Sequence, residues 1–276
     1  MVEIGRYNKL EIVKTVDFGL YLDGGDEGEI LLPKRYVPDG VRPGDAIEVF
    51  LYTDSEDRLI ATTEKPLATV GEFAYLEVVA VSGVGAFLDW GLPKDVLVPF
   101  IEQKRKMRVG EKYVVAIYLD EVTERIVASS RIKDFLSEEP PAYKEEEEVD
   151  LMVYEQTPIG FKVLINEEHT GVVYRSEVFQ PLNIGDKVKG FIKKMREDGK
   201  IDLILQKSGM AKIDSTEAKI LAMMKKNGGA IPVTDKSPSE EIYRLFGVSK
   251  KTYKKAIGAL YKKRIITLGK DKTSLV

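Results

Sequence analysis

The chain repeats one short pattern three times, and this repeat constrains the fold more than any other feature. In each copy a glycine interrupts an apolar segment, and a Gly-acidic pair follows 25 residues later. The glycines are Gly19, Gly85 and Gly160, and the pairs begin at Gly44, Gly110 and Gly185. Both landmarks shift by 66 residues from the first copy to the second and by 75 from the second to the third. Because a fixed offset marks a repeated structural unit, the sequence predicts three small domains of one fold.

Each copy contains short apolar runs that alternate with polar residues and are separated by turn-forming residues, which predicts five β-strands. Five antiparallel strands of this length close most simply into an OB-type barrel, because closure removes the exposed edges. A glycine inside a strand is typical of a sharp barrel bend or a close backbone approach. We therefore predict five-stranded β-barrels over residues 1–66, 67–136 and 149–210. Hairpin sandwiches are the weaker alternative, since five strands cover two sheets poorly.

Residues 137–148 interrupt the repeat with Pro140-Pro141 and the acidic run Glu145–Glu148. Prolines beside a run of like charges are typical of a solvated linker. This segment accounts for the longer second offset.

From residue 211 the apolar residues recur with the period of a helix. Ser237 followed by Pro238 and Glu240 predicts one helix start, and Ser249 predicts another after a turn at Gly247. A closing β-hairpin follows. Three helices and a terminal hairpin predict a winged-helix domain over residues 211–276, so the fold class is mainly β with an α C-terminal domain.

Charge is distributed unevenly along the chain. Residues from 212 onward hold 15 Lys and Arg against 6 Asp and Glu, whereas residues 1–148 hold 18 against 30. A basic C-terminal region on an acidic chain favours a polyanionic partner there. The chain has no cysteine, no apolar run near the ~20 residues that span a bilayer, and no apolar signal segment near its start. We expect a cytoplasmic protein.

The repeated unit resembles the S1 RNA-binding domain, an OB-fold, in its aromatic-Gly-x-aromatic motif, its Gly-Asp pair and its basic last hairpin. The first copy shows this in Phe18-Gly19-Leu20-Tyr21 and Gly44-Asp45. Three such units before a helical segment reading Ile242–Lys251 and Ala256–Lys262 resemble the bacterial conserved virulence factor B (CvfB/YitL-like) family over the whole chain. This resemblance implies three tandem S1-like barrels and a winged helix, RNA binding, and a post-transcriptional role in gene and virulence regulation.

The resemblance also implies which residues contact RNA. S1 domains use two aromatic residues around the second-strand glycine, a histidine on the third strand and a charged pair in the last hairpin. The matching residues are Phe18, Tyr21 and Arg58 in the first copy, Phe87 and Arg125 in the second, and Tyr174 and Lys200 in the third. Leu31 and Leu97 replace the histidine in the first two copies, so no copy carries the complete set.

Two regions are the preferred RNA surface. One region lies in the third barrel and contains Phe161, Lys162, Tyr174, Arg175 and Lys194. The other lies on the last helix and contains Lys250, Lys251, Lys254 and Lys255. Stacking of bases on exposed rings and neutralisation of phosphates by lysines would supply the affinity. The competing interpretation puts the rings in barrel cores and makes the lysines an ordinary solvated helix face.

Catalysis has little support. The one histidine, His169, lies in a charged turn, and the sequence has no phosphate-binding glycine loop and no grouped metal carboxylates. We expect no enzyme, no cofactor and no metal site. The predicted partner is single-stranded RNA. Two alternatives stay open: a DNA-binding transcriptional regulator that uses the winged helix, and a scaffold whose barrels bind ribosomal or RNA-degradation proteins.

Overall fold

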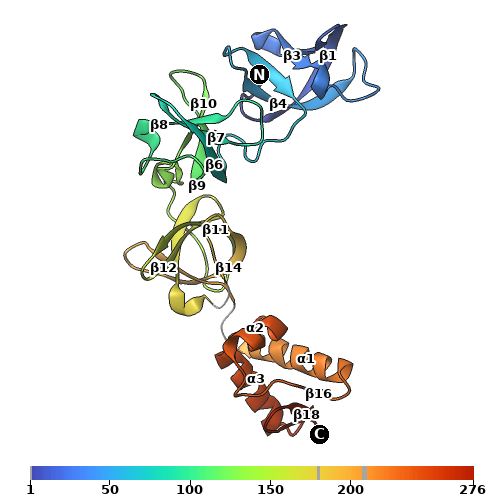
Figure 1. Ribbon diagram of the computed structural model, residues 1–276, viewed down its shortest axis with the longest axis vertical. Coiled ribbons are helices and arrows are strands. Elements are labelled where there is room, and N and C mark those ends of the chain that lie inside the picture. The colour runs from blue at the N-terminus through green and yellow to red at the C-terminus, as the bar shows by residue number, and fades with distance from the viewer. Residues whose placement is uncertain (1, 179–180, 207–209) are drawn as a thin grey trace. The chain divides into compact units, whose positions relative to one another are not determined.

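The computed structural model (Figure 1) describes the backbone of residues 2–178, 181–206 and 210–276, and their side chains except those of 210–215. The chain forms two compact units, one ending at Glu139 and the other spanning Pro140–Val276. The first unit holds two barrels, and the second holds a third barrel and a helical domain.

Each barrel is a closed five-stranded sheet, which confirms the barrel predicted from the repeat. The third and fifth strands of each barrel pair in parallel, however, where the sequence predicted only antiparallel strands. The first has the order β1-β2-β3-β5-β4, and its strands are β1 (Tyr7–Val16), β2 (Gly19–Asp23), β3 (Glu29–Pro33), β4 (Ala46–Thr53) and β5 (Leu59–Thr62). The second has the equivalent order, with strands β6 (Phe73–Val81), β7 (Gly85–Asp89), β8 (Val96–Pro99), β9 (Lys112–Leu119) and β10 (Ile126–Ser129). The third has strands β11 (Glu148–Thr157), β12 (Gly160–Ile165), β13 (His169–Tyr174), β14 (Lys187–Met195) and β15 (Ile201–Ile204).

Short 3-10 helices connect or follow these strands. They are η1 (Gly25–Glu27), η2 (Lys34–Tyr36), η3 (Phe100–Glu102), η4 (Ile132–Phe135) and η5 (Arg175–Glu177). The helices η2, η3 and η5 directly follow the third strand of their barrels.

The repeated glycines are explained by close approach of two strands. A Cβ atom on Gly19 would lie 2.2 Å from the carbonyl oxygen of Leu32 in β3. Gly85 and Gly160 would meet the equivalent carbonyls of Val98 and Val173 at 2.2 Å. Since any larger residue would push the third strand away, glycine is required at each place.

The C-terminal domain is a winged helix. Its elements are α1 (Met210–Lys226), β16 (Ala230–Ile231), α2 (Ser239–Phe246), α3 (Lys250–Lys262), β17 (Ile266–Leu268) and β18 (Thr273–Leu275), and its sheet has the order β16-β18-β17. Ser249 caps α3 by accepting a hydrogen bond from the Thr252 backbone N–H, as predicted. The predicted Ser237 cap is wrong, because α2 begins at Ser239 and the Ser237 hydroxyl accepts from the Thr234 N–H instead.

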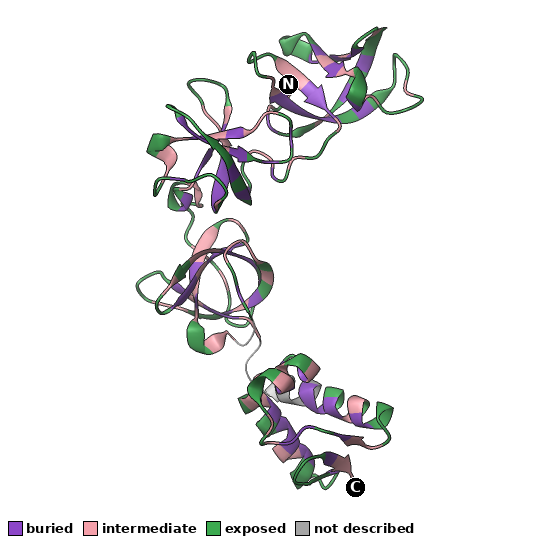
Figure 2. Ribbon diagram, viewed as in Figure 1, coloured by how far each residue is buried: buried purple, intermediate pink, exposed green. Residues whose placement is uncertain are grey.

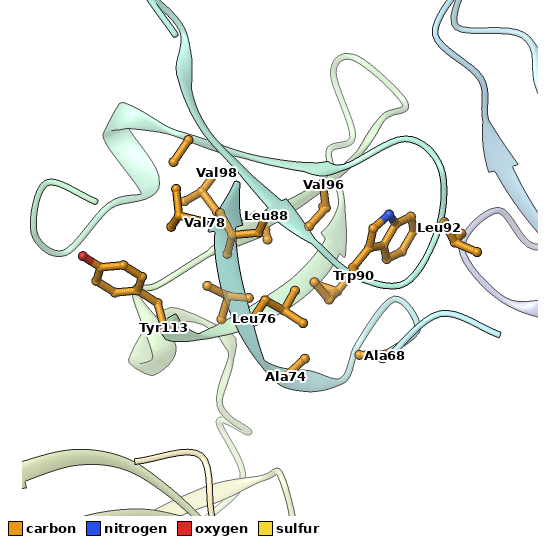
Figure 3. Packing of buried hydrophobic residues seen from close by; sticks show 14 of the residues in the cluster. Ala68, Ala74, Leu76, Val78, Leu88, Trp90, Leu92, Val96, Val98 and Tyr113 are labelled. Atoms are coloured by element: carbon orange, nitrogen blue, oxygen red, sulfur yellow. The ribbon is translucent and has the colours of Figure 1, made fainter. Parts of the chain in front are cut away.

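Figure 2 shows buried residues along the strands of all three barrels and along the helices. They form a core cluster in each barrel and one in the winged helix. One cluster, however, joins the first two barrels. Phe50 and Tyr52 point outward from β4, yet both are buried together with Trp90 and Leu92 of the second barrel. Figure 3 shows Trp90 and Leu92 in this cluster. The rings of Phe50 and Trp90 lie edge to face at 5.8 Å. Burial of each such side chain stabilises the contact by about 1.5–3 kcal/mol, so the two barrels pack as one unit.

Part of the predicted linker belongs to the third barrel. Tyr143 packs against that barrel's core, and its hydroxyl lies 2.9 Å from Nδ1 of His169. The Glu146 N–H donates to the carbonyl oxygen of Ile192 in β14. His169 is therefore half-buried and begins β13, where the sequence placed it in a charged turn.

Candidate nucleic-acid interface

The strand registers define one comparable row of residues across the outside of each barrel. We call it the outer row, and it takes one residue from each of the second, third, fifth and fourth strands. The row is Tyr21, Leu31, Ile60 and Tyr52 in the first barrel. It is Phe87, Leu97, Val127 and Tyr118 in the second, and Lys162, Val172, Asp202 and Lys194 in the third. The outer row is thus apolar or aromatic in the first two barrels and mostly charged in the third.

In the first barrel the two predicted aromatic residues lie on one face. Phe18 precedes β2 in the turn and is 57% exposed, and its ring lies 6.3 Å from that of half-buried Tyr21. Because Phe18 lies outside the strand, the alternation of strand side chains does not separate the two rings. The Lys14 ammonium lies 4.8 Å from the Tyr21 ring centroid and forms an ion pair with Glu29 at 2.5 Å.

Arg58 is held by a carboxylate within its own hairpin. Its Nε and Nη2 atoms donate to Oδ2 of Asp54 at 2.9 and 2.8 Å, and Glu56 lies 3.0 Å from Nη1. Burial would raise the pKa of Asp54, but hydrogen bonds from the Arg58 side chain and from the Arg58 and Glu56 backbone outweigh it and lower the pKa. The charge that the sequence assigned to phosphate is therefore already neutralised.

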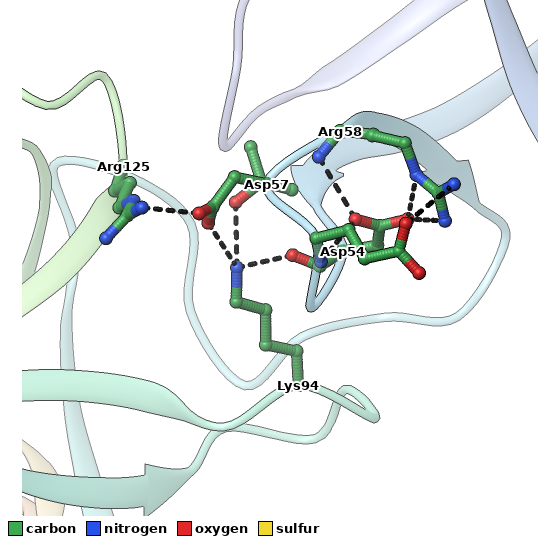
Figure 4. Close-up of polar contacts among 7 residues, drawn as sticks. Asp54, Asp57, Arg58, Lys94 and Arg125 are labelled. Carbon is green, nitrogen blue, oxygen red and sulfur yellow. Dashed lines mark hydrogen bonds and ion pairs between the residues drawn. The ribbon is translucent and has the colours of Figure 1, made fainter.

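Arg125 joins the two barrels (Figure 4). It forms an ion pair with Asp57, which lies in the last hairpin of the first barrel. Lys94 of the second barrel approaches the same carboxylate at 3.3 Å and donates to the backbone oxygen of Asp54 at 2.6 Å. Asp57 thus bridges two cations of the second barrel, and this contact gives Arg125 a structural role.

The aromatic residues of the second barrel are less accessible. Phe87 is half-buried in the outer row, and Tyr118 is covered by Phe135 of η4, with ring centroids 4.8 Å apart. Trp90 is buried at the interface between barrels, where its indole N–H donates to the Lys94 backbone oxygen at 2.7 Å. This burial leaves the Trp90 ring no face on which a base could stack.

The third barrel places several charged groups around one tyrosine. Arg196 donates to the Tyr174 hydroxyl and pairs with Asp202 at 3.1 Å. Lys200 pairs with Asp198 at 2.7 Å, and this hydrogen bond lowers the pKa of Asp198. Lys162 is half-buried and pairs with Glu155 at 3.0 Å.

Lys194 and Arg175 are cations of this barrel that stay available to a ligand. Lys194 and Arg175 are exposed, and neither forms an ion pair with any residue that the structure describes. They lie at the end of the outer row and at the start of η5.

Two sequence predictions for this barrel need correction. Phe161 is only 7% exposed and packs in the barrel core with Val153 and Val173, because it neighbours Gly160 at the strand start and turns inward. It offers no ring to a ligand. Val172, and not Tyr174, holds the third-strand place in the outer row. Tyr174 instead lies opposite Gly160, two residues further along β13 than Val172. Strand register, and not the type of side chain, decides which residue lies in the outer row.

The α3 lysines lie on the outside of the winged helix. Tyr253, Ala256, Ile257 and Leu260 fill the core, so the opposite helix face carries Lys251, Lys254 and Lys255, all exposed. None of these three lysines pairs with a carboxylate in the part of the chain whose side chains the structure describes. We call them the α3 lysine stripe. Lys250 is half-buried, and its Nζ atom donates to the Lys236 backbone oxygen at 3.3 Å.

Sequence patterns missed the residues that join the barrels, Phe50 and Asp57, and the pairing of Arg196 with Asp202. The place of Phe50 is taken by Ala116 in the second barrel and by Phe191 in the third, so the repeat carried no signal of its burial. Among the described residues no group of three acidic or histidine side chains could hold a metal ion. Within the same residues, no helix combines the length and apolar character needed to cross a bilayer.

The fold defines a class of protein, in which tandem S1-type barrels precede a winged helix. Models of two families match the chain: the S1 domain at residues 4–64 and the CvfB-like winged helix domain at residues 218–275. Protein YitL of Bacillus subtilis is 30% identical, over 94% of this chain and 89% of its own length. Conserved virulence factor B of Staphylococcus epidermidis is 25% identical, over 99% of this chain and 94% of its own. The chain belongs to the conserved virulence factor B family.

A solved structure from Streptococcus pneumoniae, described as a multidomain protein with nucleic acid binding domains, is 24% identical. It aligns over 99% of this chain and 98% of its own, with a TM-score of 0.45.

Proposed function

We propose that the protein is a non-catalytic, post-transcriptional regulator that binds single-stranded RNA through the winged helix and the third barrel. The α3 lysine stripe is the observation that carries this proposal. Three ammonium groups project from one helix face without a carboxylate partner among the described residues. Such a face attracts phosphates, and release of counterions gives affinity that falls steeply with salt.

The third barrel supplies a second surface through Lys194, Arg175 and Tyr174. Two unpaired cations beside a half-buried ring fit a strand whose phosphates are neutralised while a base contacts the ring. The S1-domain match at residues 4–64, in the first barrel, supports nucleic acid binding by a chain of such barrels.

The test is fluorescence anisotropy of the intact chain with a labelled single-stranded RNA across a salt series. The variant K251A/K254A/K255A removes the stripe, and K219A/K225A/K226A removes three exposed lysines of α1 as a matched control. We expect the first variant to weaken binding and reduce the slope of log K against log salt by about 2, at about 0.7 per lost phosphate contact. Unchanged binding and slope would exclude the stripe as the RNA surface.

Duplex DNA is the second candidate, because α2 and α3 are joined by the short turn Gly247-Val248-Ser249 of a helix-turn-helix. Recognition of bases favours Arg, Asn and Gln, whereas the exposed face of α3 presents lysines. The same titration with a DNA duplex separates the two. Tighter, sequence-dependent duplex binding would replace the RNA proposal.

A further inference from the structure

The second barrel exposes an apolar surface, and at the start of η3 this surface stands where the other two barrels carry a cation. Val84 is 60% exposed, Phe100 46% and Ile101 75%, and half-buried Phe87 and Leu97 continue the surface. We call these five residues the apolar patch. Isolated apolar side chains are normal on protein surfaces, but a contiguous group marks an interaction site.

The strand register makes the patch contiguous. Phe87 and Leu97 are direct neighbours across β7 and β8, and the Phe100 N–H lies 3.4 Å from the carbonyl oxygen of Val84. Gly85 separates these two pairs, and the Leu97 Cδ1 atom lies only 3.0 Å from where a Gly85 Cβ would be. Leu97 therefore covers the glycine and connects both ends of the patch.

Comparison of the three barrels shows that Phe100 and Ile101 of the patch stand where other barrels carry basic residues. The residue that opens the 3-10 helix after the third strand is Lys34 in η2 and Arg175 in η5. In η3 that place is taken by Phe100, followed by Ile101 where the first barrel has Arg35. A surface that binds phosphates would retain these cations, and aliphatic side chains such as Ile101 offer no ring for base stacking.

Basic residues border the patch on one side. The segment Lys104–Arg108 continues directly from η3 and contains four Lys or Arg residues. Gln103 fixes it beside β8 by donating to the Val98 backbone oxygen at 3.1 Å and accepting from the Met107 N–H at 3.0 Å. The Arg131 guanidinium lies 3.4 Å from the Ile101 backbone oxygen. The expected ligand is therefore apolar at its centre and acidic at its flank.

We propose that the apolar patch binds a short segment of a partner protein in which aliphatic or aromatic side chains adjoin Asp or Glu residues. The apolar side chains would cover Val84, Phe100 and Ile101, and the carboxylates would face the Lys104–Arg108 segment. Burial of the apolar groups supplies the affinity, while the charges set the orientation and exclude basic segments. The proposal is independent of RNA binding by the third barrel and α3.

The test uses the intact chain to select dodecapeptides from a random display library. Enriched peptides are synthesised and titrated against the wild type, against F100D/I101D, and against V122D. Val122 is the matched control, because it is 91% exposed in the β9–β10 turn of the same barrel and lies outside the patch. Both patch substitutions are at exposed positions, and circular dichroism and the melting temperature verify that the variants fold.

We expect enriched peptides to combine apolar and acidic residues, to bind F100D/I101D at least tenfold more weakly, and to bind V122D as they bind the wild type. Exchange of their Asp and Glu for Asn and Gln should also weaken binding. The proposal is overturned if no peptide is enriched over the F100D/I101D background, or if the selected peptides are basic. It is equally overturned if F100D/I101D impairs binding of single-stranded RNA, or abolishes a dimer seen by sedimentation velocity, since RNA or a second copy would then be the occupant.

Discussion

The second and third barrels share one strand order and one set of glycine contacts, yet their outer faces differ. The outer row of the second barrel is apolar or aromatic and carries no charge, whereas that of the third contains Lys162, Asp202 and Lys194. The barrel depends on inward side chains and close strand contacts, and neither constrains the outer row. The same barrel can therefore present different chemistry on its outer row in each copy.

The first two barrels also differ from the third in how they use their last hairpins. Asp54 neutralises Arg58, and Asp57 attracts Arg125 and Lys94, so these cations stabilise packing within the chain. In the third barrel the place of Asp54 is taken by Arg196. The third barrel thus carries Arg196 at the hairpin position where the first two barrels carry Asp54 and Asp120.

Removal of an interface ring is expected to have the largest effect. Phe50→Ala deletes a fully buried ring that packs on Trp90, and substitutions of this kind cost about 3–5 kcal/mol. Trp90 is the one tryptophan of the chain, so its fluorescence reports on the two joined barrels. Among the described residues the α-helices of the chain are α1, α2 and α3, so the signal at 222 nm reports on the winged helix. In urea, tryptophan fluorescence should shift to a lower midpoint while the helical signal at 222 nm stays unchanged.

Phe18→Ala serves as the control for this experiment, because that ring is exposed and its loss should cost under about 0.5 kcal/mol. An equal shift of the fluorescence and helical transitions would contradict a local role for Phe50 in joining the two barrels.

High pH should act on the winged helix through Tyr253. Burial raises the pKa of Tyr253 to about 12, and its hydroxyl donates to the Val233 backbone oxygen at 3.2 Å. Because the folded state holds the proton more tightly, this contribution to stability is complete below pH 10 and is lost between pH 10 and 12. The circular dichroism signal at 222 nm should be lost in that pH range, together with a rise in tyrosinate absorbance. In Tyr253→Phe the midpoint of this loss should lie at higher pH. An unchanged midpoint would exclude this tyrosine as the cause.

The Asp57 bridge should contribute less. Asp57→Asn removes the ion pairs with Lys94 and Arg125, all partly exposed, and exposed pairs contribute about 0.2–1 kcal/mol each. Urea unfolding followed by tryptophan fluorescence should show a small destabilisation that disappears in 1 M salt, since salt screens exposed charges. Glu56→Gln in the same hairpin is the control. A loss that persists in high salt would show that Asp57 acts through packing rather than charge.

Gly258→Ala should change the free energy of unfolding least, and the change should be stabilising. Gly258 lies inside α3, and a Cβ there would meet no atom within 4 Å. Alanine in a helix interior is favoured over glycine by about 0.5–1 kcal/mol. A higher melting temperature with unchanged RNA affinity is the expected result. A drop in affinity at increased stability would instead show that RNA approaches the backbone of α3 closely.

The sequence predicted much of the fold because its signals are local. The glycine spacing, the alternating strands and the Ser249 cap each depend on a few neighbouring residues, and all three are confirmed. The α3 lysines could also be placed outside, since a helix with one apolar face has only one other face for its charges.

The sequence by itself thus determined three barrels, a winged helix and a basic outer helix face. Only the tertiary structure decided which outward side chains are covered, because coverage depends on segments distant in the chain. Phe50 and Trp90 are each buried by the neighbouring barrel, and Arg125 of the second barrel is neutralised by Asp57 of the first. Alternation along one strand carries no information about a second barrel, so exposure of these residues could not be predicted.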